Sequence, residues 1–119
     1  MKHTHTETDL PIENQYPKLV RDNIPTMIER DGKTASTHIA EKEEYVRFLL
    51  LKLIEEATEL SNAEGLDHQK EEIADVREVL GAIQVTLGFP EDELGTIQAS
   101  KFSERGGFAG RIILDLKPE

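Results

Sequence analysis

The sequence contains no cysteine and no tryptophan, and only 5% of its 119 residues are aromatic. The absence of cysteine excludes a disulfide framework, a zinc–thiolate site and thiol catalysis. No apolar run approaches the roughly 20 residues that a transmembrane helix needs, and the N-terminus lacks the continuous apolar stretch of a secretory signal. We therefore expect a cytoplasmic protein without a membrane partner.

Positive charge is also scarce, because 14 Lys and Arg residues stand against 24 Asp and Glu residues and give a formal net charge of -10. No cluster of basic residues is dense enough to neutralise successive backbone phosphates, so we expect no nucleic-acid partner. A chain of this length with 37% hydrophobic residues can bury only one small core. Association with further copies would enlarge that core.

The chain divides into a polar N-terminal tail and one helical domain. Residues 1–15 are Thr-rich and show no periodicity, which predicts a mobile tail, and the domain covers residues 16–119. Glycine and proline mark the ends of three long helices, which we expect from about Glu41 to Ala63, from about Asp67 to Leu87, and from Pro90 to near Gly106. Pro25 opens a further short helix that Gly32 stops.

Two segments have the composition of strands. Residues 35–39 are rich in Thr and Ser with a β-branched end, and residues 111–116 read RIILDL. They predict a small antiparallel ribbon. The expected fold class is therefore all-α, a helical bundle with a small β-ribbon that oligomerisation completes.

Two pairs of acidic residues stand out by their spacing and their place on the helices. Glu56 with Glu59 and Glu72 with Asp75 are each three residues apart, which places both carboxylates of a pair on one helix face. At about 100° per residue, Glu56 and Glu72 fall inside the apolar arcs of their helices. Two such helices packed antiparallel would bring four carboxylates together, and all-oxygen ligands favour Mg²⁺, with Mn²⁺ as a substitute. Acids at this spacing also occur on solvated helix faces, so the apolar placement is what favours a metal site.

The helix expected at residues 41–63 carries a second apolar strip, formed by Leu50, Ile54 and Ala57. One face of this helix already supplies the core of a small domain. The second strip therefore predicts a subunit interface.

Three motifs follow one another along the chain: YPKLVRDNIP at residues 16–25, EExxE at residues 55–59 followed by ExxD at residues 72–75, and KFSERGGF at residues 101–108. In this order they resemble the motifs of the MazG-type all-α nucleoside triphosphate pyrophosphohydrolases. The resemblance is to a small branch of predicted house-cleaning noncanonical NTP pyrophosphatases, related to phosphoribosyl-ATP pyrophosphohydrolase. It implies a MazG-like homodimer or homotetramer that cleaves an NTP to a monophosphate and pyrophosphate with Mg²⁺.

The resemblance also implies roles for individual residues. The metal ligands would be Glu56, Glu59, Glu72 and Asp75. Glu55, which with Glu56 forms the catalytic acid pair, would act from the outer shell or position the attacking water. The substrate phosphates need further cations, for which the candidates are Lys18, Arg21, Lys101 and Arg105.

Other functions compatible with the sequence are a phosphoribosyl-ATP pyrophosphohydrolase and a non-catalytic, metal-binding helical module that oligomerises. A di-iron oxidoreductase also uses inward-facing acids, but it requires a Glu-x-x-His motif. None of the four histidines stands three residues after a glutamate. The nucleobase, the number of metal ions, the general base and the oligomer size stay open.

Overall fold

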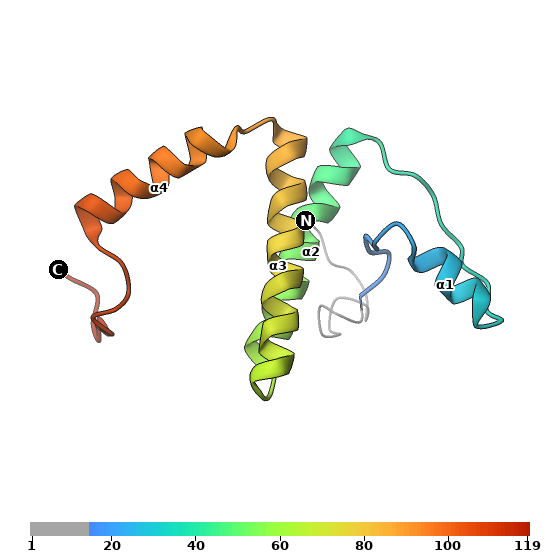
Figure 1. Ribbon diagram of the computed structural model, residues 1–119, viewed down its shortest axis with the longest axis horizontal. Helices are drawn as coiled ribbons and strands as arrows, with labels where there is room; N and C mark the ends of the chain where they lie inside the picture. The colour runs from blue at the N-terminus through green and yellow to red at the C-terminus, as the bar shows by residue number, and fades with distance from the viewer. Residues whose placement is uncertain (1–14) are drawn as a thin grey trace. The chain divides into compact units, whose positions relative to one another are not determined.

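The computed structural model describes residues 15–119, and every regular element among them is a helix (Figure 1). The helices are α1 (Ile24–Arg30), α2 (Lys42–Asn62), α3 (Leu66–Leu87) and α4 (Glu91–Arg105). The prediction of an all-α fold class is confirmed, and the bounds of the three long helices agree with the sequence-based ones to within one or two residues. The tail predicted for residues 1–15 lies, apart from Gln15, outside the described residues.

Local sequence explains where the helices begin and end. A proline occupies the first turn of α1, and Pro90 caps α4, whose first turn is acidic as the positive end of a helix favours. Gly65, in the connection from α2 to α3, has a φ of +85°, a conformation that residues with a Cβ rarely adopt. None of the helices in residues 15–119 combines the length and the apolar character needed to cross a membrane.

The chain forms two compact units, of which the first ends at Leu87 and the second comprises residues 88–119. In the described part of the first unit, α2 and α3 pack against each other as an antiparallel pair, and α1 packs on neither of them (Figure 1). The segment before α1 runs beside α2, since Lys18 forms an ion pair with Glu55. The second unit consists of α4 and an irregular C-terminal segment. That residues 16–119 act as one domain stays a prediction.

The core of the helix pair is small and unusually acidic. Two apolar residues are buried among the described ones, Leu49 and Val79, whereas the buried polar or charged residues number three and are all glutamates. Other apolar side chains of the pair stay about half exposed, among them Leu50, Ile54, Ile73 and Leu80. Leu50 and Ile54 project roughly 160° away from Lys52 around α2. The helix pair therefore has an exposed apolar strip on α2, which includes Leu50 and Ile54, and an acidic interior.

The predicted β-ribbon is wrong, because the structure contains no strand in residues 15–119 and its two segments belong to different units. The C-terminal segment begins with Arg111 in the left-handed region, at a φ of +57°, rather than in extended backbone. A strand needs a neighbouring strand for its backbone hydrogen bonds, so a single extended segment does not form a sheet. The apolar side chains of this segment, including Ile112 and Leu116, are exposed instead.

Candidate active site

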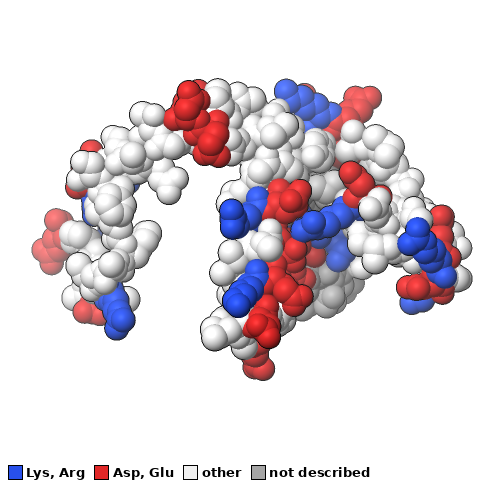
Figure 2. All heavy atoms as spheres, in the orientation of Figure 1, with Lys and Arg blue, Asp and Glu red and all other residues white. Residues whose placement is uncertain are grey.

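The predicted acidic residues lie along the interface between α2 and α3. Glu55 and Glu56 on α2 and Glu72 on α3 are buried, and Asp75 is half-buried. On the face shown in Figure 2, acidic side chains gather along the helix pair with basic ones among them. Other charged residues of α3 are exposed, namely Lys70, Glu71, Arg77 and Glu78. Helical periodicity thus separated the interface acid Glu72 from its solvated neighbours.

Carboxylate oxygens from both helices form two overlapping groups. In one group, oxygens of Glu55, Glu56 and Glu59 lie within 4.8 Å of one another, and all three come from α2. In the other, oxygens of Glu56, Glu72 and Asp75 lie within 4.8 Å of one another and join the two helices. Glu56 belongs to both groups. The structure therefore brings three of the four predicted metal ligands into one group and places Glu59 beside it through Glu56.

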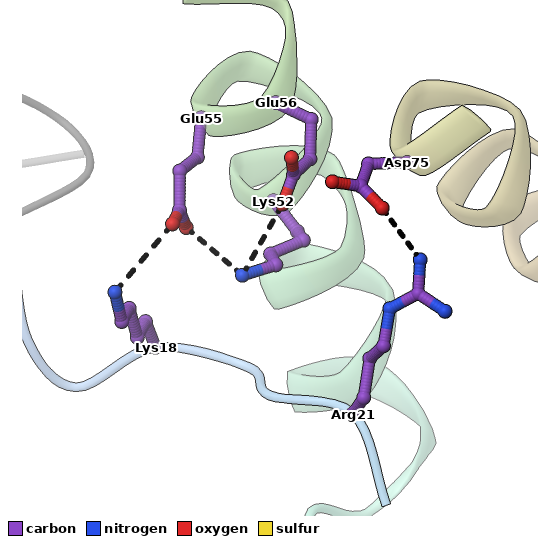
Figure 3. Close-up of polar contacts among 6 residues, drawn as sticks. All are labelled: Lys18, Arg21, Lys52, Glu55, Glu56 and Asp75. Atoms are coloured by element: carbon purple, nitrogen blue, oxygen red, sulfur yellow. Dashed lines mark hydrogen bonds and ion pairs between the residues drawn. The ribbon is translucent and has the colours of Figure 1, made fainter. Parts of the chain in front are cut away.

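Basic side chains pair with part of this cluster (Figure 3). Both oxygens of Glu55 face an ammonium, since Lys18 Nζ lies 3.5 Å from Oε2 and Lys52 Nζ lies 3.3 Å from Oε1. Lys52 Nζ also lies 3.5 Å from Oε1 of Glu56. On the side of α3, Arg21 donates a 2.8 Å hydrogen bond to Oδ1 of Asp75. The segment before α1 is thus tied to the acids of both helices.

Within residues 15–119, two buried carboxylate oxygens have no hydrogen-bond partner, Oε2 of Glu56 and Oε2 of Glu72. The other oxygen of Glu72 lies 3.5 Å from Nε2 of His68, one turn earlier on α3. Taking an ionised carboxylate out of water costs several kcal/mol unless a counter-charge compensates it. Glu56 and Glu72 come from facing helices and belong to one group of acids, so a single cation between the helices could contact both carboxylates.

Electrostatics single out Glu56 among these acids. Its pKa is raised from 4.5 to about 7, first by burial and then by the neighbouring carboxylate of Glu59, with which it can share a proton. The charge of Lys52 lowers the pKa, and that of Asp75 raises it. The fold therefore favours a proton or a cation at Glu56.

The predicted phosphate-binding residues divide between the two units of the chain. Lys18 and Arg21 lie at the carboxylate cluster and contact its members. Lys101 and Arg105 lie on α4, in the second unit, so their role stays a prediction. Lys52 was not among the predicted site residues, although its spacing of three and four residues from Glu55 and Glu56 is the spacing at which side chains meet on a helix.

A small cavity of about 30 Å³ opens beside Glu55. Its polar lining includes Lys18, Lys52 and Glu55, and Phe48 and Leu51 contribute apolar walls. This volume holds one water molecule, and the polar groups supply the hydrogen-bond partners that such a water needs.

Comparisons of the chain with protein families, with curated proteins and with solved structures give no match. The resemblance to MazG-type enzymes consequently depends on the three motifs and their order. Membership of that family stays a prediction. The clustered carboxylates are compatible with it because they can bind a divalent metal ion.

The raised pKa of Glu56 predicts a pH-dependent loss of stability in the metal-free protein. The folded state keeps the proton up to about pH 7, whereas the unfolded chain releases it near pH 4.5. The contribution of Glu56 to stability is therefore largest below pH 4.5 and falls as the pH rises to 7, by about 3 kcal/mol in all. Denaturant titrations should show this fall in the wild type but not in Glu56→Gln.

The matched control is Glu64→Gln, because Glu64 is exposed in the connection between α2 and α3. This variant should follow the wild-type pH profile. Parallel profiles for the wild type and Glu56→Gln would contradict the assignment of the raised pKa to Glu56.

Proposed function

We propose that the chain is a Mg²⁺-dependent nucleoside triphosphate pyrophosphohydrolase that cleaves an NTP, including noncanonical ones, to a monophosphate and pyrophosphate. The observation that carries the proposal is the pair of buried, unpaired oxygens on Glu56 and Glu72. The order of the three motifs supports it. The wider proposal is a house-cleaning activity in the cytoplasm.

The residues of the second acidic group fit a divalent metal ion. Glu56, Glu72 and Asp75 would hold it, with Glu59 next to them through Glu56. Their donors are all carboxylate oxygens, which suit Mg²⁺ or Mn²⁺ and disfavour zinc or copper. When bound, such an ion would neutralise phosphate charge and hold phosphate oxygens in place.

Basic residues at the cluster can complete the neutralisation of a polyphosphate. Lys18 and Arg21 lie beside the acids, and the side chain of Arg21 is 59% exposed, so its guanidinium can reach a ligand. Arg binds phosphate oxygens in a bidentate manner, whereas Lys acts as a point charge. In the proposal, Lys101 and Arg105 of α4 add to this set.

Glu55 is suited to act on the attacking water, because its carboxylate borders the cavity that can hold a water molecule. In the proposed reaction the water oxygen forms a bond to the α phosphorus while the bond from that phosphorus to the bridging α–β oxygen breaks. Pyrophosphate leaves with the bonding electrons, and Glu55 accepts one water proton. The other water proton stays on the monophosphate.

The exposed apolar strip of the helix pair is part of the proposal. Leu50 and Ile54 on α2 are 47% and 52% exposed, and α1 does not cover them. A chain with two buried apolar residues among those described gains stability when a second copy covers such a strip. We therefore propose that the chain forms a homodimer or a homotetramer.

The activity is tested by incubating the protein with a panel of canonical and noncanonical NTPs and Mg²⁺, and by measuring pyrophosphate and monophosphate. We expect Glu72→Gln to lower kcat/KM by at least about a hundredfold, because it removes a charged donor from the metal group. The control is Glu71→Gln, which changes the exposed neighbouring acid and should leave kcat/KM unchanged.

Failure of the wild type to release pyrophosphate from any NTP would argue for the non-catalytic metal-binding module. Release of orthophosphate without a monophosphate would indicate a different reaction. Preference for phosphoribosyl-ATP over every triphosphate would indicate the related pyrophosphohydrolase.

Self-association is tested by sedimentation velocity. Ile54→Asp places a charge on the exposed apolar strip and should shift the protein to a smaller species. Asn62→Asp adds the same charge at an exposed position of α2 away from that strip and should keep the wild-type size. A wild type that sediments as a monomer would exclude the interface.

A further inference from the structure

Lys52 is a charged residue in the interior of the site that no motif assigns. Its side chain is only 16% exposed and lies between the two adjacent acids of α2. The ammonium is 3.3 Å from Oε1 of Glu55 and 3.5 Å from Oε1 of Glu56 (Figure 3). Because these residues are three and four positions after Lys52 on one helix, the backbone of α2 fixes this arrangement.

The two acids that contact Lys52 differ in how many of their carboxylate oxygens have a partner. Glu55 has an ammonium at each oxygen, since Lys18 lies 3.5 Å from Oε2. Glu56 uses Oε1 for Lys52 and keeps Oε2 buried and unpaired. Glu72 on α3, which also has a buried oxygen without a hydrogen-bond partner among the described residues, belongs to the same group of acids as Glu56. Two ammonium groups thus pair with Glu55, whereas Glu56 shares one of them and keeps an oxygen for a cation between the helices.

The acids of α2 alone could otherwise attract a metal ion. Glu55, Glu56 and Glu59 bring oxygens within 4.8 Å of one another, as close as the group that joins the helices. An ion in this group would lie close to the ammonium groups of Lys18 and Lys52, and like charges at such distances repel strongly where water is excluded.

The formal charges of the cluster agree with one divalent ion. Its five acids, those of both groups together, carry five negative charges. The basic residues paired with them are Lys18, Arg21 and Lys52, which return three positive charges. The Lys and Arg residues thus leave two of these negative charges, the charge that a single Mg²⁺ or Mn²⁺ neutralises.

We propose that Lys52 is a positioning residue that, with Lys18, excludes the metal ion from the Glu55 side of the cluster and directs it to the group formed by Glu56, Glu72 and Asp75. Glu55 is thereby kept for the water that the adjacent cavity can hold. This inference rests on the proposed function, because it assigns Glu55 and the metal group their separate tasks.

The test counts bound Mn²⁺ by electron paramagnetic resonance of the free ion and measures kcat and KM for pyrophosphate release. Lys52→Met keeps the length of the side chain and removes its charge, whereas Lys52→Arg keeps the charge. We expect one Mn²⁺ per chain in the wild type and in Lys52→Arg, and two in Lys52→Met. The kcat of Lys52→Met should fall at least tenfold, with KM changed less than threefold.

Lys70→Met is the matched control, because Lys70 is exposed on the outer side of α3, and it should bind one Mn²⁺ with the wild-type kcat. If Lys52→Met does not fold, Lys18→Met removes the other ammonium from Glu55 and should also admit a second ion. A folded variant with one ion and unchanged kcat, beside an active wild type, overturns the role of Lys52 alone. A wild type that binds no Mn²⁺ overturns the proposed function as well.

Discussion

The burial of Glu56 and Glu72 against each other's helices is the constraint on which the rest of the structure depends. A pair of helices with so few buried apolar side chains gains little from hydrophobic burial, and it also has to accommodate three buried glutamates. Each carboxylate oxygen at the interface must find a cation, a proton or a hydrogen-bond donor. The raised pKa of Glu56 and its unpaired oxygen show that the side chains of residues 15–119 meet only part of this requirement.

The basic residues around the cluster give its acids different electrostatic environments. Lys18 and Lys52 each contact one oxygen of Glu55, and Arg21 contacts one oxygen of Asp75. These contacts also tie the segment before α1 to the helix pair, so the same residues stabilise the fold and set the charge of the site. A phosphate ligand would compete for Lys18 and Arg21, which links binding to the position of that segment.

Sequence patterns predicted the long helices and the burial of Glu72, but they did not predict the tertiary contacts of the site. Glycine and proline punctuation located α2, α3 and α4, and the apolar arc of α3 predicted the burial of Glu72, because both depend on local geometry. The prediction of a β-ribbon failed, because strand pairing depends on a neighbouring strand that the composition of one segment does not reveal. The approach of Arg21 to Asp75, which are 54 residues apart, is likewise a tertiary contact that no local pattern encodes. Lys52 could have been found from its spacing to Glu55 and Glu56.

The central claim is that the unpaired oxygens of Glu56 and Glu72 share a divalent ion, and crystals grown with millimolar Mn²⁺ test it most directly. The account predicts an anomalous difference peak between α2 and α3, at roughly 2.1 Å from an oxygen of each of these two residues. Manganese bound only at the surface, with both oxygens still unpaired or joined through a shared proton, would contradict it.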